Sequence, residues 1–266
     1  MGVDESQCLQ SAIRAARAAG EILRRGFGRA HEVEYKGPID PVTESDRASE
    51  ACIVAILREA TPGCGFLTEE NAPVSGENGL RWIIDPLDGT VNYAHGSPHF
   101  SVSIALERAG ELQVGVIYDP LRDELFAAAR GRGATLNGRP IRVAGTSPLS
   151  AAAVTTGFPY DVWTEGDQDN VTEAIHFLRR AQSLRVTGSS ALDLAAVACG
   201  RCDAHWERSL LPYDVAAGIL LVREAGGVVT DFAGGPERLY HGEIVAANPA
   251  LHAELLAYLR TRPRQR

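Results

Sequence analysis

Residues 82–92 read Trp-Ile-Ile-Asp-Pro-Leu-Asp-Gly-Thr-Val-Asn. The apolar residues at the start are typical of a short buried strand, and Pro86 and Gly89 favour a tight turn directly after it. The strand therefore delivers Asp85 at its end, and the turn brings Asp88 back beside it. Carboxylates on one rigid turn are well placed to bind a hard cation, which prefers oxygen ligands. Taken alone, the stretch is also compatible with a purely structural turn.

The backbone amides of the same turn are expected to bind a second kind of ligand, an anion. Because Gly89 has no side chain, its amide and that of Thr90 can face a phosphate at the start of a following helix. The stretch therefore predicts a cation site and an anion site side by side.

Further acidic residues lie at the boundaries of predicted elements. Glu69 and Glu70 follow the short strand 65–68, Asp214 opens an apolar helix, and Asp46 begins another helix. Each has an ordinary explanation, because strand-end carboxylates are often solvated and the helix dipole stabilises an acid in the first turn. As a set they indicate more, since clustered carboxylates repel one another unless cations lie among them.

The periodicity of the whole chain predicts mixed helices and strands. Helices are expected at 6–27, 45–60, 168–182, 190–199, 214–225 and 249–260. Strands are expected at 65–68, 82–84, 101–106, 114–118, 124–129, 152–156, 184–187, 203–207, 227–232 and 243–246.

This order of elements indicates an α+β or layered α/β/α/β architecture and not a continuous Rossmann winding. The stretch 100–143 is an antiparallel meander, with Asn137-Gly138 as a hairpin turn. A seam is expected near 145–150, which divides one compact catalytic unit into an N-terminal α+β portion, 1–145, and a C-terminal α/β portion, 146–266.

Composition excludes several classes of protein. The 266 residues carry a formal net charge of −8, which argues against a nucleic-acid-binding protein. The arginines of the tail, 260–266, are expected to be a solvated end. We find no apolar run of about 18 residues and no apolar signal-peptide core, so no membrane association is expected and the cytoplasm is the default location.

The cysteines predict free thiols. The chain has 5 of them, an odd number, and only Cys199 and Cys202 form a CxxC pair. That pair lacks the partners of a zinc site and runs from a helix end into a strand, so a redox role is the weaker alternative.

Taken together, the acidic segments resemble the inositol monophosphatase family. The likeness spans roughly 30–250, and its bacterial inositol-1-phosphatase type is the most similar. It implies a layered αβαβα sandwich of the sugar-phosphatase type. The blocks that carry it are Lys36–Asp46, Gly65–Glu70, Asp85–Asn92, Thr156–Tyr160, Thr187–Asp193 and Pro212–Gly218.

The resemblance implies a cofactor of two or three Mg²⁺ ions. Glu69, Asp85 and the carbonyl of Leu87 would hold the first ion. Asp85, Asp88 and Asp214 would hold the second, with Asp85 bridging, and a third, weaker ion would lie near Glu69. Divalent cations offset the repulsion between an anionic nucleophile and a phosphate dianion, and they lower the pKa of bound water.

The resemblance also implies roles for residues around the ions. Thr90 and Asp46 would position and deprotonate the attacking water, with Glu69 as a further catalytic residue. Glu207, which precedes Asp214 by seven residues, would accept hydrogen bonds from ring hydroxyls. The implied substrate contacts are Asp88, Gly89, Thr90, Gly188, Ser190, Glu207 and Asp214.

The chain departs from the family pattern at two positions. Thr68 stands where glycine is common, and Tyr213 stands where tryptophan is common. Neither change removes a ligand, but both can reshape the pocket wall and so alter the preferred substrate.

The sequence therefore predicts an Mg²⁺-dependent phosphatase that hydrolyses myo-inositol monophosphate or a similar small polyol or sugar phosphate by attack of metal-activated water. Fructose-1,6-bisphosphate, NADP, histidinol phosphate and adenosine 3′,5′-bisphosphate are the alternative substrates. A homodimer is expected by resemblance. From another class of function, a protein that binds the transcription machinery is the alternative.

Overall fold

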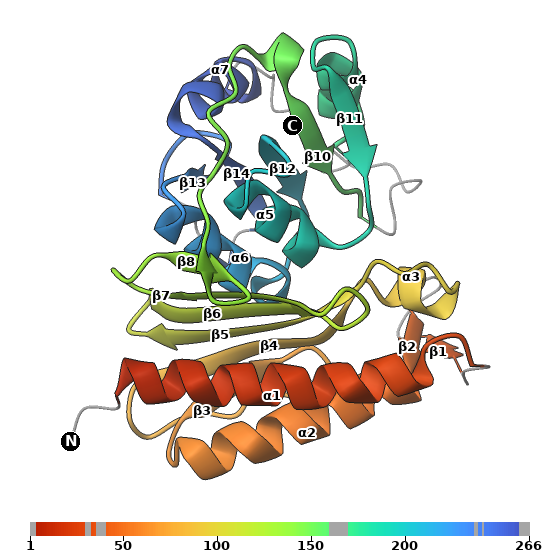
Figure 1. Cartoon of the computed structure of the whole chain (residues 1–266), viewed down its shortest axis with the longest axis vertical. Helices are drawn as coiled ribbons and strands as arrows, with labels where there is room; N and C mark the ends of the chain where they lie inside the picture. The colour runs from red at the N-terminus through yellow and green to blue at the C-terminus, as the bar shows by residue number, and fades with distance from the viewer. Residues whose placement is uncertain are drawn as a thin grey trace.

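The computed structural model describes residues 4–29, 33–35, 41–159, 170–236, 239–240 and 242–260. Its elements stack as a helix layer, a sheet, a second helix layer, a second sheet and a third helix layer (Figure 1). The expected α+β class and αβαβα sandwich are therefore confirmed.

The first helix layer consists of α1 (Glu5–Gly26) and α2 (Glu44–Ala60). The face of α1 against the sheet is made mainly of alanines, with Leu23 at its end, and these side chains are fully buried. Small side chains at helical spacing let α1 lie close to its neighbours. The helix predicted over 6–27 is thus confirmed to within a residue.

The first sheet is a meander whose strands follow chain order, and only its first pair, β3 with β4, is parallel. Asn137 and Gly138 both have positive φ, 49° and 76°, as expected for the predicted hairpin turn. The strands are β3 (Gly65–Thr68), β4 (Leu80–Asp88), β5 (Ser101–Arg108), β6 (Glu111–Asp119), β7 (Glu124–Ala129), β8 (Ala134–Leu136) and β9 (Arg139–Pro140).

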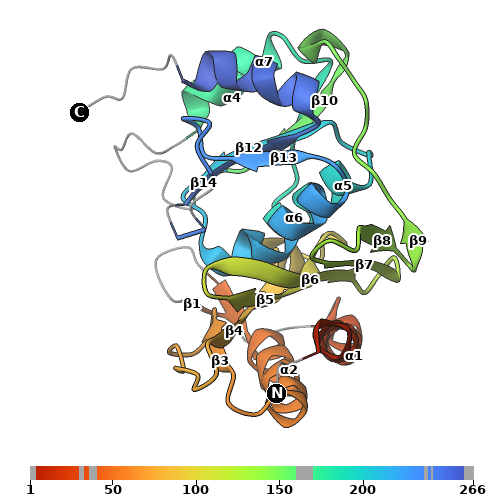
Figure 2. The same ribbon diagram turned by 90° about the vertical axis from the view of Figure 1, so that its left-hand side faces the viewer.

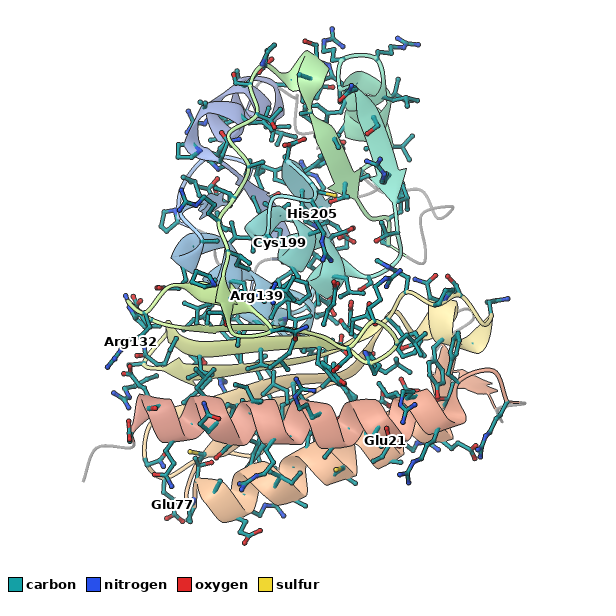
Figure 3. The ribbon with its side chains drawn as sticks, in the orientation of Figure 1. Glu21, Glu77, Arg132, Arg139, Cys199 and His205 are labelled. Atoms are coloured by element: carbon teal, nitrogen blue, oxygen red, sulfur yellow. The ribbon has the colours of Figure 1, made fainter. Side chains whose placement is uncertain are left out.

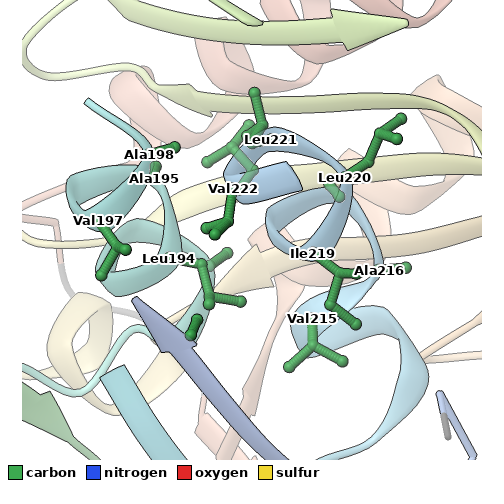
Figure 4. Close-up of a cluster of buried hydrophobic side chains, with 14 of the residues drawn as sticks. Leu194, Ala195, Val197, Ala198, Val215, Ala216, Ile219, Leu220, Leu221 and Val222 are labelled. Carbon is green, nitrogen blue, oxygen red and sulfur yellow. The ribbon is translucent and has the colours of Figure 1, made fainter. Parts of the chain in front are cut away.

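The second helix layer, α5 (Ser190–Ala198) and α6 (Pro212–Glu224), lies between the two sheets. Every residue from Val215 to Val222 is buried, because α6 has packing partners on all sides. Figure 4 shows Leu194 of α5 beside the apolar side chains of α6. This layer fixes the N-terminus of α6 between the sheets.

The second sheet is mixed and has the order β11-β10-β12-β14-β13. Its central strand β12 is parallel to β10 and antiparallel to β14. The outer helices α4 (Val171–Leu178) and α7 (Pro249–Leu259) cover its far face (Figure 2). The strands are β10 (Ala153–Thr156), β11 (Ser183–Val186), β12 (Ala204–Arg208), β13 (Val228–Thr230) and β14 (Glu243–Ala247).

Several details differ from the sequence prediction. The helix predicted over 168–182 is described only as Val171–Leu178, and the chain then turns so that the amide of Gln182 donates to the carbonyl of Ala152. The pair β1 (Val33–Tyr35) and β2 (Pro41–Thr43), the short helix α3 (Thr90–Ala94) and the 3₁₀ turn Leu149–Ala151 were not predicted as elements.

Some expectations fall on residues outside the described ranges. These are Lys36–Asp40 of the loop before α2, Tyr160, and residues 261–266 of the arginine-rich tail. Within the described part of the chain, no helix combines the length and apolar character needed to cross a bilayer.

Candidate active site

A cavity of about 540 Å³ lies where the ends of β3, β4, α3, α5, β12 and α6 meet. Every implied metal ligand and substrate contact lines it: Glu69, Asp85, Leu87, Asp88, Gly89, Thr90, Gly188, Ser190, Glu207 and Asp214. Asp46 is the one expected site residue that does not line it. The structure therefore brings residues from distant parts of the chain to one cavity.

The strand predicted over 82–84 continues to Asp88, so Asp85 and Asp88 lie within β4, which carries a β-bulge between them in place of the predicted turn. Asp85 pairs with Ser103 of β5, and pairing resumes between Asp88 and Ser101, so β4 has one residue more than its partner here. The amide of Leu87 donates to Oδ1 of Asp85 at 3.0 Å. Because a bulge re-aims side chains, both aspartates reach the cavity from a strand that otherwise alternates between two packed faces.

The carboxylates at the cavity repel one another. Asp85 is 3% exposed, and burial raises the pKa of its carboxyl well above the usual range, as do the negative charges of Glu69, Asp88 and Asp214. Burial also raises the pKa of Asp214 well above its usual range, although its carboxylate accepts a hydrogen bond from the amide of Leu211 at 2.7 Å. Negative charge therefore accumulates where the sequence predicts cations.

Asp88 occupies a more polar setting. Its Oδ2 accepts hydrogen bonds from the hydroxyl of Ser101 at 3.0 Å and from the hydroxyl of Ser189. Burial nevertheless raises the pKa of Asp88 to about 6. The two serines therefore fix one oxygen of Asp88.

The expected pair Thr90 and Asp46 is brought together at the start of α2. Thr90 Oγ1 lies 3.2 Å from Oδ1 of Asp46 and 2.9 Å from the carbonyl oxygen of Leu87, and its single proton can be donated to one of them at a time. The other oxygen of Asp46 accepts from the amide of Thr43 at 2.9 Å, which closes a capping box. Burial raises the pKa of Asp46. Asp46 thus both caps a helix and contacts Thr90.

Gly89 must be glycine for two reasons. Its φ is 90°, in the left-handed region, and a Cβ there would lie 3.0 Å from the carbonyl oxygen of His99 and 3.1 Å from that of Gly188. Gly89 therefore borders the cavity with its backbone alone.

Glu69 projects from a loop supported by a buried carboxylate of α2. Glu50 is 2% exposed and accepts hydrogen bonds from the Thr68 hydroxyl at 3.0 Å and from the Glu70 amide at 2.9 Å. Thr68 thus braces this loop and does not line the cavity, whereas Tyr213 does. Of the two departures from the family pattern, only Tyr213 shapes the cavity wall.

The donor set fits Mg²⁺ in its chemistry. It consists of carboxylates and one backbone carbonyl, which are the hard oxygen ligands that this ion prefers, and its charge calls for a cation. Within the described residues, no three histidine, cysteine, aspartate or glutamate side chains are already grouped so as to hold a metal ion. The residues therefore fit Mg²⁺ by the type of their donor atoms and by their negative charge.

The opposite wall of the cavity carries Glu207 on β12. Glu207 is 7% exposed, and its Oε2 accepts a hydrogen bond from the Ser190 hydroxyl at 2.7 Å. A Cβ at Gly157 would overlap the Glu207 carboxylate, because Oε1 is the atom closest to that position. Gly157 thus makes room for this side chain beside the cavity.

Sequence reasoning missed the residues behind Glu207. His205 is fully buried on the same strand, and its Nε2 lies 3.2 Å from Oε2 of Glu207. Asp193 on α5 lies on the other side of this imidazole, and burial raises its pKa to about 7. The sequence held one signal for His205: it lies two residues before Glu207, and residues two apart on a strand point to the same face.

The CxxC pair does not have the properties of a redox site. Cys199 and Cys202 are both free thiols, as expected. Burial raises the pKa of both, that of Cys202 to about 11, whereas reactive cysteines have lowered pKa values.

Comparison with known proteins identifies the family. The model of the inositol monophosphatase family matches residues 4–264. An inositol-1-monophosphatase from Mesorhizobium japonicum is 46% identical over 255 residues, which cover 94% of this chain and 95% of that protein. The Nus factor SuhB of Pseudomonas aeruginosa is also 46% identical, over 257 residues that cover 93% of this chain and 94% of that protein.

The fold agrees with these matches. The solved inositol monophosphatase of Anabaena (Nostoc) superimposes with a TM-score of 0.87 at 44% identity, and the match covers 97% of this chain and 96% of that one. The chain therefore belongs to the inositol monophosphatase family and is a phosphatase.

Proposed function

We propose that this enzyme hydrolyses myo-inositol monophosphate, or a similar small polyol or sugar phosphate, in an Mg²⁺-dependent reaction. The observation that carries the proposal is that Glu207 and the carboxylates at the end of β4, Asp85 and Asp88, line one cavity. Its volume of about 540 Å³ is within the ordinary range for small-molecule sites.

Two or three Mg²⁺ ions, when bound, supply charge neutralisation of the phosphate and a water of lowered pKa. The residues that would hold them are Glu69, Asp85, Asp88, Asp214 and the carbonyl of Leu87. Support comes from the mutual repulsion of these carboxylates, which a cation relieves.

Thr90 and Asp46 form the proton-transfer pair of the proposal. Thr90 Oγ1 can accept a hydrogen bond from the attacking water while it donates its own proton to Asp46 Oδ1, 3.2 Å away. Asp46 then takes up the proton, for which its raised pKa makes it a better base than an exposed aspartate. The capping box holds Asp46 in place for this transfer.

Substrate recognition is divided between the two walls. The amides of Gly89 and Thr90 are proposed to receive the phosphate, since both residues line the cavity and Gly89 adds no side chain of its own. Gly188, Ser190 and Glu207 are proposed to contact the hydroxyl groups, where an ionised carboxylate accepts hydrogen bonds from neutral donors.

A substrate panel tests this proposal. Purified protein is assayed with Mg²⁺ against myo-inositol monophosphate, fructose-1,6-bisphosphate, NADP, histidinol phosphate and adenosine 3′,5′-bisphosphate. We expect the highest kcat/KM for the inositol ester. Slower turnover of that ester than of all the others would reject the choice of substrate and leave the phosphatase chemistry in place.

A second candidate role, in the transcription machinery, is favoured by the relative named Nus factor SuhB at 46% identity. Its test is co-purification with RNA polymerase factors, in the wild type and in an Asp85→Asn variant without phosphatase activity. Retention by both proteins supports the binding role, and loss of all such factors from the wild type rejects it. A homodimer and a cytoplasmic location are further parts of our proposal.

A further inference from the structure

A buried polar chain lies at the wall of the cavity that carries Glu207; both of its ends, Asp193 and Glu207, border the cavity, and His205 lies behind them. It runs from Asp193 on α5 through His205 to Glu207 on β12. His205 is 0% exposed and does not border the cavity, so it cannot touch a substrate. Figure 3 places it in the interior of the C-terminal layers.

The surroundings of the imidazole restrict its protonation. Nδ1 lies 2.9 Å from the hydroxyl oxygen of Thr155, and that hydroxyl can either donate to Nδ1 or accept from it. If Thr155 donates, the neutral ring carries its proton on Nε2. If Thr155 accepts, a bare Nε2 would face the Glu207 carboxylate at 3.2 Å, so the ring must be doubly protonated. In both cases Nε2 carries a proton.

The Nε2 proton needs an acceptor. Among the described residues, Nε2 has no hydrogen bond of regular geometry, and an unsatisfied buried donor is costly. The nearest charged partner of Nε2 is Oε2 of Glu207, 3.2 Å away at ion-pair distance, and the same oxygen accepts a hydrogen bond from Ser190 at 2.7 Å. These contacts fix one oxygen of Glu207 and leave Oε1, beside Gly157, on the side of the cavity.

The charges around His205 also favour a protonated imidazole. Burial by itself would lower the pKa of the imidazole, but the contact with Glu207 and the negative charges of Asp193, Glu207 and Asp88 outweigh it and raise the pKa. The residues paired with His205 across the sheet are both neutral, Thr155 on β10 and Ala246 on β14.

We propose that His205 is a positioning residue that fixes the Glu207 carboxylate for recognition of substrate hydroxyl groups. The inference rests on the proposed function of Glu207 in polyol binding. His205 acts on selectivity, because it contacts Glu207 and not the carboxylates at the end of β4, Asp85 and Asp88. Without it, Glu207 loses a donor to Oε2 and can rotate away from the hydroxyl groups.

The test compares His205→Phe and His205→Gln on two substrates. Phe supplies an aromatic ring without the two nitrogens, whereas the side-chain amide of Gln can place a donor near the position of Nε2. For His205→Phe we expect KM for inositol monophosphate to rise about tenfold, with a change in kcat and in p-nitrophenyl phosphate hydrolysis below about twofold. His205→Gln should return KM to within about threefold of the wild type.

The chain offers a matched control in His252 of α7. It is 6% exposed, and its Nε2 lies 2.9 Å from the hydroxyl oxygen of Thr230, so it is also a buried histidine beside a threonine. It does not border the cavity. His252→Gln should leave the ratio of the two substrates unchanged.

A double mutant identifies the route of the effect. If His205 acts through Glu207, His205→Phe combined with Glu207→Gln should have the KM of Glu207→Gln alone. Additive effects, or equal losses on both substrates for His205→Phe, would overturn the inference. A Glu207→Gln variant without any selective loss would instead overturn the polyol-binding role of Glu207 in the proposed function.

A measurement on the wild type covers the case in which His205→Phe does not fold. The ¹⁵N spectrum of the chain's 7 histidines, assigned with His205→Gln, reports the protonation of each ring nitrogen. We expect a protonated Nε2 on His205 at neutral pH. An unprotonated Nε2 there would overturn the inference.

Discussion

The two walls of the cavity treat their carboxylates differently. On the wall from the first sheet, the charges that act most strongly on Asp85 are the negative ones of Glu69, Asp88 and Asp214. On the wall from the second sheet, Glu207 accepts a hydrogen bond from the hydroxyl of Ser190 and faces the imidazole of His205. The negative charge of the first wall calls for a cation, whereas the second wall offers a carboxylate that suits neutral hydroxyl groups. We propose that the chemistry takes place at the first wall, to which Asp214 of α6 also belongs, and that substrate selection takes place at the second.

The largest expected effect is on the first wall. Asp85→Asn should lower kcat by at least ~10²-fold on every substrate, because it removes the carboxylate that would bridge the cations. Steady-state assays on inositol monophosphate and p-nitrophenyl phosphate measure it. Asp123→Asn, an exposed aspartate paired with Arg17, is the control and should keep full activity. A variant of Asp85 that spares one substrate would contradict the division between the walls.

A smaller and selective effect is expected on the second wall. Glu207→Gln keeps the size of the side chain but weakens its hydrogen bonds to hydroxyl groups, so kcat/KM for inositol monophosphate should fall about tenfold. Hydrolysis of p-nitrophenyl phosphate, which has no such hydroxyl groups, should fall much less. Equal losses on both substrates would refute the role assigned to Glu207.

Mg²⁺ bound by the carboxylates of the first wall should also stabilise the folded protein. Because Mg²⁺ binds the native state, saturating Mg²⁺ should raise Tm by a few degrees, corresponding to ~2.7 kcal/mol at about 100 times Kd. Thermal unfolding with Mg²⁺ and with EDTA measures the difference. The rise should be lost in Asp85→Asn and kept in Glu207→Gln, and a rise of equal size in both variants would place the cation elsewhere.

The smallest effect is expected at the CxxC pair, which lies outside both walls. The double change Cys199→Ser and Cys202→Ser should alter kcat/KM by less than about twofold, since both thiols are free and their pKa values are raised. Activity measured with and without a thiol reductant provides the comparison. A strong dependence on reductant in the wild type would contradict this expectation.

Much of the fold could be predicted because its signals are local. The periodicity of α1 and the turn at Asn137 are contained in short windows, and both are confirmed. The end of α4 was missed because no glycine or proline marks it and a contact with Ala152 ends it. The pair β1 and β2 is too short to produce a period.

The candidate site divides in the same way. Asp85 and Asp88 could be brought together because Pro86 and Gly89 predict an interruption of the strand here, although the structure has a β-bulge within β4 and not the predicted turn. The position of His205 behind Glu207 could not, because it depends on Thr155 and on a helix from another part of the chain. Sequence spacing shows that two residues share a face of a strand, but only packing decides which of them reaches the cavity.

The two contacts of Asp46 have a consequence for heat inactivation. One oxygen closes the capping box at the start of α2, and the other faces Thr90. Helix ends fray at temperatures at which a buried core is still intact. Loosening of this first turn alone would separate the proton acceptor from its hydroxyl, so turnover should cease in a molecule whose two sheets are still folded. The temperature of half-inactivation would then lie below the midpoint of unfolding.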